Sequence, residues 1–168
     1  MTSVTGDKLM TIGHRFRHRI YYTQERIQSI PTVFYRSTRS SLPTIGNNPH
    51  LPVGLSSKID LFREEQYSLV IENSRQRNYF TEKLCDCLIT KTIPVYYGCP
   101  NIADYFDTTG WIILEKDSVD DLLSKLENLT PDHYANCLSI VERNFETTRH
   151  YIDFHSNIND ALRKLPGY

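Results

Sequence analysis

The sequence lacks the marks of several protein classes. It contains no stretch near the roughly 18 consecutive apolar residues that a membrane-spanning helix needs. Residues 1–10 also lack the apolar region of a secretory signal. The four cysteines form no Cys-x-x-Cys pair, the histidines show no ligand spacing, and no Asp-x-Asp pair is present. We therefore expect no membrane segment, no metal site and no required cofactor. A cytoplasmic location is favoured, and metal dependence stays open.

An excess of charge of one sign is missing as well. The chain has 19 Lys and Arg residues against 20 Asp and Glu residues, which gives a net charge of −1. Because a dedicated nucleic-acid-binding protein is normally strongly basic, this balance argues against a nucleic-acid partner. The basic segment 14–19 is the one feature that would support such a partner.

The length and composition fit one folded domain. The chain has 168 residues, of which 39% are apolar and 23% charged, so a packed core is possible and wholesale disorder is not expected. A chain of this length leaves little room for a second domain. We treat residues 1–168 as a single domain.

Short apolar runs predict β-strands buried on both faces. They lie at residues 32–35, 67–71, 93–97 and 111–114, with a weaker candidate at 2–5. Their residues are apolar almost without interruption, which is typical of the strands of a parallel sheet rather than of a sheet with one wet face.

Helical periodicities lie between these runs. They cover residues 15–29, 80–88, 118–127 and 130–145, and a last short helix is predicted at 157–164. Strands and helices therefore alternate. This pattern predicts an α/β fold, with a Rossmann-like parallel sheet and helices on both of its faces.

Three residues are predicted to cap helices. Ser118 forms a capping box with Asp121, and Thr81 precedes the helix that follows the 67–71 strand. Thr130 and Pro131 have the sequence of an N-cap and a first helical residue.

Polar clusters follow three of the predicted strands. Open parallel sheets bind ligands beyond the carboxyl ends of their strands, so these clusters are expected to converge at one edge. The first cluster contains Arg15, Arg17 and Arg19 at a helix start, where free amides and the helix dipole favour anions. On a helix, Arg15 and Arg19 share one face and Arg17 points away from it. A solvated basic face is the alternative interpretation.

The other clusters lie at 72–74 with 78–83, and at 98–101. Lys83 could face a phosphate and Glu82 could accept hydrogen bonds from a ribose, although an ordinary charged first turn has the same composition. Glu72 and Asn73 end a buried strand and must find partners, either in a ligand or in neighbouring loop backbone. The cysteines are interpreted as buried core residues.

Three motifs in this region resemble the donor-binding signature of the α-1,3-fucosyltransferases, glycosyltransferase family 10. They are YSLVIENS at 67–74, NYFTEKL at 78–84 and TIPVYYGCPN at 92–101. The family pattern is roughly FxFENS, YxTEK and TIPIYWGxP in the same order and spacing. The match covers about a quarter of the chain, and the segment 13–17 also looks like the family's first helix of this domain, more weakly.

The resemblance implies one half of a GT-B arrangement, namely the C-terminal domain that binds GDP-fucose for inverting transfer of fucose to a glycan acceptor. Carried over by motif, the donor-binding positions are Arg17, Asn73, Tyr79, Glu82 and Lys83. Glu82 would bind the ribose, Lys83 the diphosphate, and Tyr79 and Asn73 would help to hold the phosphates. Arg17 is chosen for the phosphate-binding arginine, and Arg15 and Arg19 stay open as alternatives.

The resemblance also implies what this chain would not contain. The general base would belong to an N-terminal acceptor-binding domain, which we expect to be absent from residues 1–168, so no catalytic residue is assigned and the chain alone would be inactive. The alternative is a non-catalytic module that binds a nucleotide sugar or a glycan.

Overall fold

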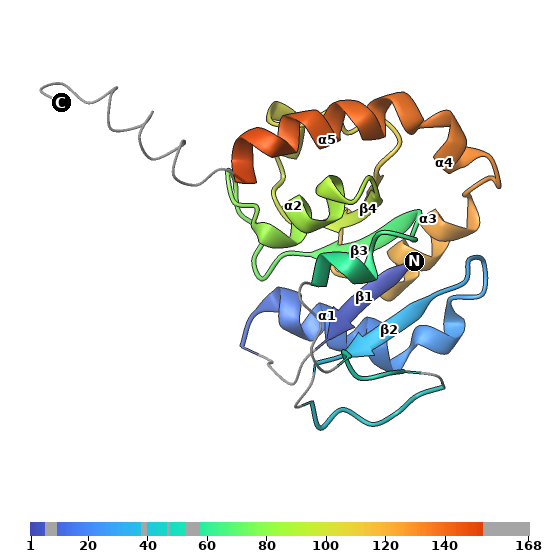
Figure 1. Ribbon diagram of the computed structural model, residues 1–168. Coiled ribbons are helices and arrows are strands. Elements are labelled where there is room, and N and C mark those ends of the chain that lie inside the picture. Colours follow the sequence, from blue (N-terminus) through green and yellow to red (C-terminus); the bar gives the residue numbers. More distant parts are fainter. Residues whose placement is uncertain (6–9, 38–39, 47, 53–57, 153–168) are drawn as a thin grey trace, which may run out of the picture.

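The sheet has five strands, all parallel. In the computed structural model, which describes residues 1–5, 10–37, 40–46, 48–52 and 58–152, the strand order is β2-β1-β3-β4-β5 (Figure 1). The strands are β1 Thr2–Thr5, β2 Val33–Arg36, β3 Tyr67–Ile71, β4 Ile93–Tyr97 and β5 Ile112–Ile113. The predicted strands are thus confirmed, including the weak candidate at the start of the chain. The prediction of an α/β fold with a parallel sheet is also confirmed.

In the residues that the structure describes, five α-helices connect or follow the strands. They are α1 Ile12–Tyr22, α2 Glu82–Ile89, α3 Val119–Glu127, α4 His133–Asn136 and α5 Leu138–Ile152. Thr81 and Ser118 cap α2 and α3 as predicted, because their hydroxyl groups accept the backbone N–H of Lys83 and of Asp121. In the described part of the chain, no helix combines the length and the apolar character needed to cross a bilayer.

Two predicted helix boundaries differ from the structure, and one predicted helix cannot be compared with it. The first helix ends at Tyr22 rather than at residue 29, because the Thr23 hydroxyl donates to the carbonyl of Arg19 and a 3-10 turn follows. The predicted start at Thr130 is wrong, because α4 begins after Asp132 and a break at Cys137 separates it from α5. The helix predicted at 157–164 lies outside the described residues.

Helices cover both faces of the sheet because successive strand residues point to opposite sides. Within β3, Leu69 and Ile71 belong to the same buried cluster as Phe16 of α1. The intervening Val70 belongs instead to the cluster that contains Leu84 of α2. Helix α1 therefore lies on one face of the sheet and α2 on the other.

The order of winding reverses between β1 and β3. From β1 the chain moves outward to β2, and it then returns past β1 to form β3, β4 and β5 on the other side. The two central strands pair in register only at Thr2 and Ser68, so their carboxyl ends diverge. In open α/β sheets of this order, such a switch point is where ligands bind.

Candidate functional site

A cavity of about 590 Å³ opens where β1 and β3 diverge. Its described walls come from β1, β3, α1, α2 and the segments around Ser37 and Phe62. The ionisable side chains around it are His14, Arg17, Glu82, Lys83 and Asp86. Apolar strand residues such as Val4 and Val70 also line it, so charged groups from two helices meet over an apolar floor.

Helix α1 begins against the end of β3. Thr11 caps the helix by accepting the His14 N–H, and the Gly13 N–H donates to the carbonyl of Asn73 at 3.1 Å. A Cβ atom on Gly13 would lie 1.8 Å from the carbonyl oxygen of Glu72, far inside van der Waals contact. Glycine at this position therefore allows α1 to start directly over the strand end.

Arg17 lies one turn further along α1 and reaches across to β3. Its guanidinium donates to the carbonyl oxygen of Ile71 and to Oδ1 of Asn73, the latter at 3.0 Å. Burial lowers the pKa of Arg17, and the negative charges of Glu72 and Glu82 oppose this effect. An arginine stays protonated at neutral pH, so the cavity has a fixed positive charge on this side.

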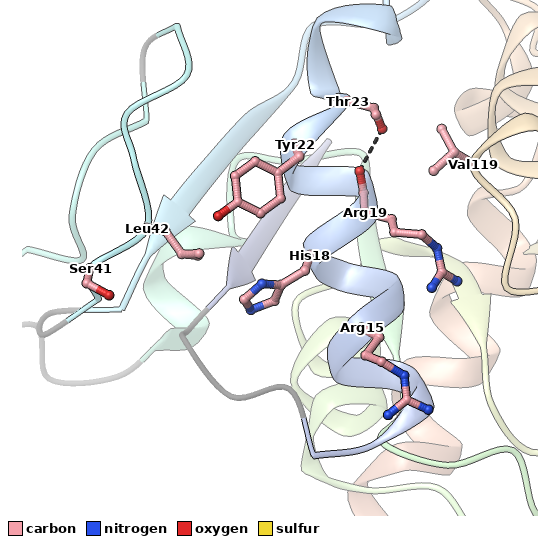
Figure 2. A pocket seen from close by; sticks show the side chains of 8 residues that line it. All are labelled: Arg15, His18, Arg19, Tyr22, Thr23, Ser41, Leu42 and Val119. Carbon is pink, nitrogen blue, oxygen red and sulfur yellow. Dashed lines mark hydrogen bonds between the residues drawn. The ribbon is translucent and has the colours of Figure 1, made fainter.

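The other two arginines of the basic cluster point away from this cavity, as the helical spacing predicted. Figure 2 shows Arg15 and Arg19 projecting from the same side of α1, where they border a separate hollow of about 670 Å³. Arg19 donates to the Asp117 carboxylate at 2.8 Å and to its carbonyl oxygen at 2.6 Å. This hollow does not adjoin the strand ends, so we place the candidate site at the switch point.

Glu72 follows β3 directly and is fully buried. Its Oε1 accepts the backbone N–H of Thr81 at 2.9 Å and its Oε2 accepts the Thr81 hydroxyl at 2.8 Å. The ammonium of Lys83 lies 3.8 Å from Oε2. Burial raises the pKa of Glu72, and the Thr81 hydrogen bonds and the Lys83 charge only partly offset this.

The first turn of α2 holds Lys83 by its side chain as well as its backbone. The Lys83 ammonium donates to Oγ1 of Thr81 at 3.1 Å and to Oε1 of Glu82 at 3.0 Å. Partial burial pushes the pKa of Glu82 upward, but the hydrogen bond and charge of Lys83 outweigh it, so the pKa ends below its ordinary value. Glu82 is therefore ionised at neutral pH and largely exposed at the cavity edge.

Four of the five predicted donor-binding residues come together here. Arg17, Glu82 and Lys83 border the cavity, and Asn73 is joined to Arg17. Tyr79 is half-buried in the loop before α2, where its N–H donates to the carbonyl of Gln76 at 3.3 Å, and it is not among the described residues that line the cavity.

Glu72 was not among the predicted site residues, although its carboxylate was expected to need hydrogen-bond partners at the end of a buried strand. Its partner is Thr81. Thr81 was predicted only as a helix cap. The available signal was a carboxylate at the end of an apolar run, followed nine residues later by a capping threonine.

Metal-ligating side chains do not gather in this part of the protein. Among the described residues, no group of three His, Cys, Asp or Glu side chains is placed to hold an ion. All four cysteines are free, and Cys87, Cys99 and Cys137 are buried.

Comparison with known proteins gives a consistent result. The model of "Glycosyltransferase family 10 (fucosyltransferase) C-term" matches residues 37–158. An α-(1,3)-fucosyltransferase FucT of Helicobacter pylori is 28% identical over 86 residues, which is 49% of this chain and 18% of that protein. GDP-fucose protein O-fucosyltransferase 3 of Xenopus laevis is 27% identical over 143 residues, which is 83% of this chain and 28% of that protein.

Solved structures share the fold. A crystal structure of an α1,3-fucosyltransferase with GDP-fucose superposes with a TM-score of 0.57 and 17% identity, covering 90% of this chain and 46% of that one. Another, with GDP, gives a TM-score of 0.56 and 20% identity, covering 82% of this chain and 37% of that one. The chain thus spans less than half the length of these relatives.

Proposed function

The chain belongs to glycosyltransferase family 10, the fucosyltransferases, and from this we propose that it is the donor-binding part of a fucosyltransferase and binds GDP-fucose at the switch-point cavity. The observation that carries the proposal is the pairing of Arg17 and Lys83. They come from helices on opposite faces of the sheet, yet both border one cavity at the strand ends.

The proposed roles follow from the chemistry of each group. Lys83 contacts the diphosphate, since an ammonium has three donors and only two are used within the described residues, by Thr81 and Glu82. Arg17 presents a planar fork suited to phosphate oxygens. The ionised Glu82 accepts hydrogen bonds from the ribose hydroxyls, and Asn73 holds Arg17 in place. Tyr79 is proposed as a further phosphate contact on the motif alone.

These groups also suit glycosyl transfer. Negative charge grows on the diphosphate as the bond to fucose breaks, so cations aimed at the diphosphate stabilise the transition state more than the bound donor. Inverting transfer additionally needs a base for the acceptor hydroxyl. We propose that this base comes from an acceptor-binding domain rather than from residues 1–168. The glycan acceptor would then bind between the two parts.

Calorimetry with GDP and GDP-fucose tests the proposal. We expect the 168-residue chain to bind both, and Lys83→Met to weaken binding of either by about tenfold to a hundredfold, because a hydrogen bond to a charged group contributes about 1.5–3 kcal/mol. Lys125→Met removes the same charge from α3 and is the matched control. No binding of wild-type protein at millimolar GDP would refute the proposal.

The second candidate is a non-catalytic module that binds a nucleotide sugar or a glycan, because the groups gathered around the cavity suit donor binding whether or not transfer follows. Both candidates predict donor binding. Transfer of fucose by the 168-residue chain to β-galactoside or N-acetylglucosamine acceptors would exclude the module and would also refute our assignment of the base to another domain.

A further inference from the structure

The side chain of Glu72 is closely packed by its neighbours, and it is not among the described residues that line the cavity. Its side chain is fully buried, and a Cβ on Gly98 would lie 2.7 Å from its Cγ. A Cβ on Gly13 would lie 1.8 Å from its carbonyl oxygen. Burying a carboxylate is costly unless specific partners satisfy it. An apolar side chain would fill this space without that cost, so the charge itself needs an explanation.

The hydrogen bonds of Thr81 explain why a charged group lies at this position. A carboxylate can only accept hydrogen bonds. The Thr81 N–H and O–H must therefore both donate to Glu72, one to each carboxylate oxygen. With its only proton committed to Oε2, the Thr81 oxygen has lone pairs left to accept. They face Lys83, whose N–H lies 3.4 Å and whose ammonium lies 3.1 Å from that oxygen.

We propose that Glu72 is a positioning residue for donor binding, which fixes the direction of the Thr81 hydroxyl so that its oxygen holds the Lys83 ammonium toward the diphosphate. The proposal rests on the proposed function, since it concerns the geometry of the same lysine. The ammonium lies 3.8 Å from Glu72, beyond hydrogen-bond distance, so Thr81 is the link between them.

Glu72→Gln is the informative change because glutamine keeps the shape and reverses one hydrogen bond. The amide oxygen still accepts the Thr81 N–H, but the amide NH₂ now faces the hydroxyl as a donor. Thr81 must then accept from Gln and turn its own proton elsewhere, toward the side where the Lys83 ammonium lies. The Thr81 hydroxyl proton and the protons of the Lys83 ammonium then repel each other, so the ammonium moves away from Thr81.

The experiment measures the dissociation constant of GDP by calorimetry for wild type, Glu72→Gln, Thr81→Val, Thr81→Ser and the double variant Glu72→Gln/Thr81→Val. We expect about tenfold weaker binding for Glu72→Gln and for Thr81→Val, which corresponds to one hydrogen bond of a charged group. Thr81→Ser keeps the hydroxyl and should bind as wild type does. The double variant should bind no more weakly than Thr81→Val alone, because both changes break one link.

A control variant separates positioning from loss of stability. Asn144 is buried on α5, away from the cavity. Its side-chain amide accepts the N–H of Asp107 and donates to the carbonyl oxygen of the same residue. Asn144→Ala should lower the melting temperature and leave GDP affinity unchanged. Glu72→Gln should weaken GDP binding in protein that is still folded at the temperature of the titration, because its effect acts through Thr81 and Lys83.

The outcomes are distinct. If wild type does not bind GDP, the proposed function fails and the positioning role fails with it. If wild type binds and Lys83→Met weakens binding, but Glu72→Gln binds as wild type does, only the positioning role fails. Additive losses in the double variant would also overturn it. Should Glu72→Gln not fold, the Thr81→Val and Thr81→Ser pair decides, since equal affinities in these two exclude a role for the hydroxyl.

Discussion

Gly13→Ala is the sharpest structural test of how the site is assembled. The new methyl group would lie 1.8 Å from the carbonyl oxygen of Glu72, whereas real Cβ atoms essentially never come closer than 3.0 Å to another heavy atom. Helix α1 and the end of β3 must therefore separate by about 1 Å or more, which a close-packed interior resists. The separation also stretches the hydrogen bond from the Gly13 N–H to Asn73.

The expected loss of stability combines three effects. Overpacking costs about 1–3 kcal/mol, and the weakened hydrogen bond costs about 0.5–1.5 kcal/mol. The higher helix propensity of alanine returns up to about 1 kcal/mol. The net loss is about 2 kcal/mol. With a urea dependence of about 2 kcal/mol per molar, the midpoint of unfolding should fall by about 1 M.

The same displacement should affect ligand binding, because Arg17 lies one turn after Gly13 and is tied to the strand end by Ile71 and Asn73. We expect GDP affinity to fall by about tenfold, as for loss of one charged hydrogen bond. Gly46→Ala is the control. A Cβ there meets open space at φ +63°, so backbone strain costs about 1–2 kcal/mol while the site is unchanged. Wild-type stability and wild-type affinity in Gly13→Ala would refute the reasoning.

Two further predictions concern ionisation. Burial raises the pKa of Glu72 above its ordinary value of 4.5 against the opposing effects of Thr81 and Lys83, so its contribution to stability is complete below pH 4.5 and is lost as the pH rises through the raised pKa. The free energy of unfolding of wild type minus that of Glu72→Gln should therefore increase as the pH falls from 7 toward 4.5. A difference that does not change with pH would contradict the assignment. Burial also raises the pKa of Cys85 to about 11, so at pH 8 on the order of 0.1% is thiolate, and iodoacetamide should label it at least tenfold more slowly than a free thiol. The rate is measured by mass spectrometry of the peptide that contains Cys85. Labelling at the rate of free cysteine would refute this prediction.

The elements that sequence reasoning placed well are those with strong local signals. β3 and β4 have the predicted bounds because each is a nearly continuous apolar run of five residues that the sheet buries on both faces. The caps Thr81 and Ser118 were found because an N-cap hydroxyl acts within three residues, a range that the sequence contains entirely.

The misplaced helix boundaries lack the usual sequence signals. Thr23 ends α1 through its own hydroxyl, whereas glycine or proline is the usual stop signal. The helical stripe over residues 130–145 continues across two helices, so periodicity gave no sign of the break at Cys137. Cys137 is buried next to Gly110, where a Cβ would lie 2.3 Å from its sulfur, and no local pattern could reveal that contact.

The candidate site was partly within reach of the sequence. The edge of the sheet followed from the rule that parallel sheets bind ligands beyond the carboxyl ends of their strands. Helix geometry separated Arg17 from Arg15 and Arg19. What the sequence could not supply was the link from Glu72 through Thr81 to Lys83, since it requires knowing that the end of β3 lies under the first turn of α2.

The way each arginine is held explains why Arg17 is better suited than Arg19 to bind an anion. In the described part of the chain, Arg17 donates to a carbonyl and to an amide oxygen, both neutral, so its positive charge is not cancelled by direct contact. Arg19 donates to the carboxylate of Asp117, which neutralises it. An incoming diphosphate would have to displace Asp117 from Arg19, whereas it can add to Arg17 without breaking a described bond.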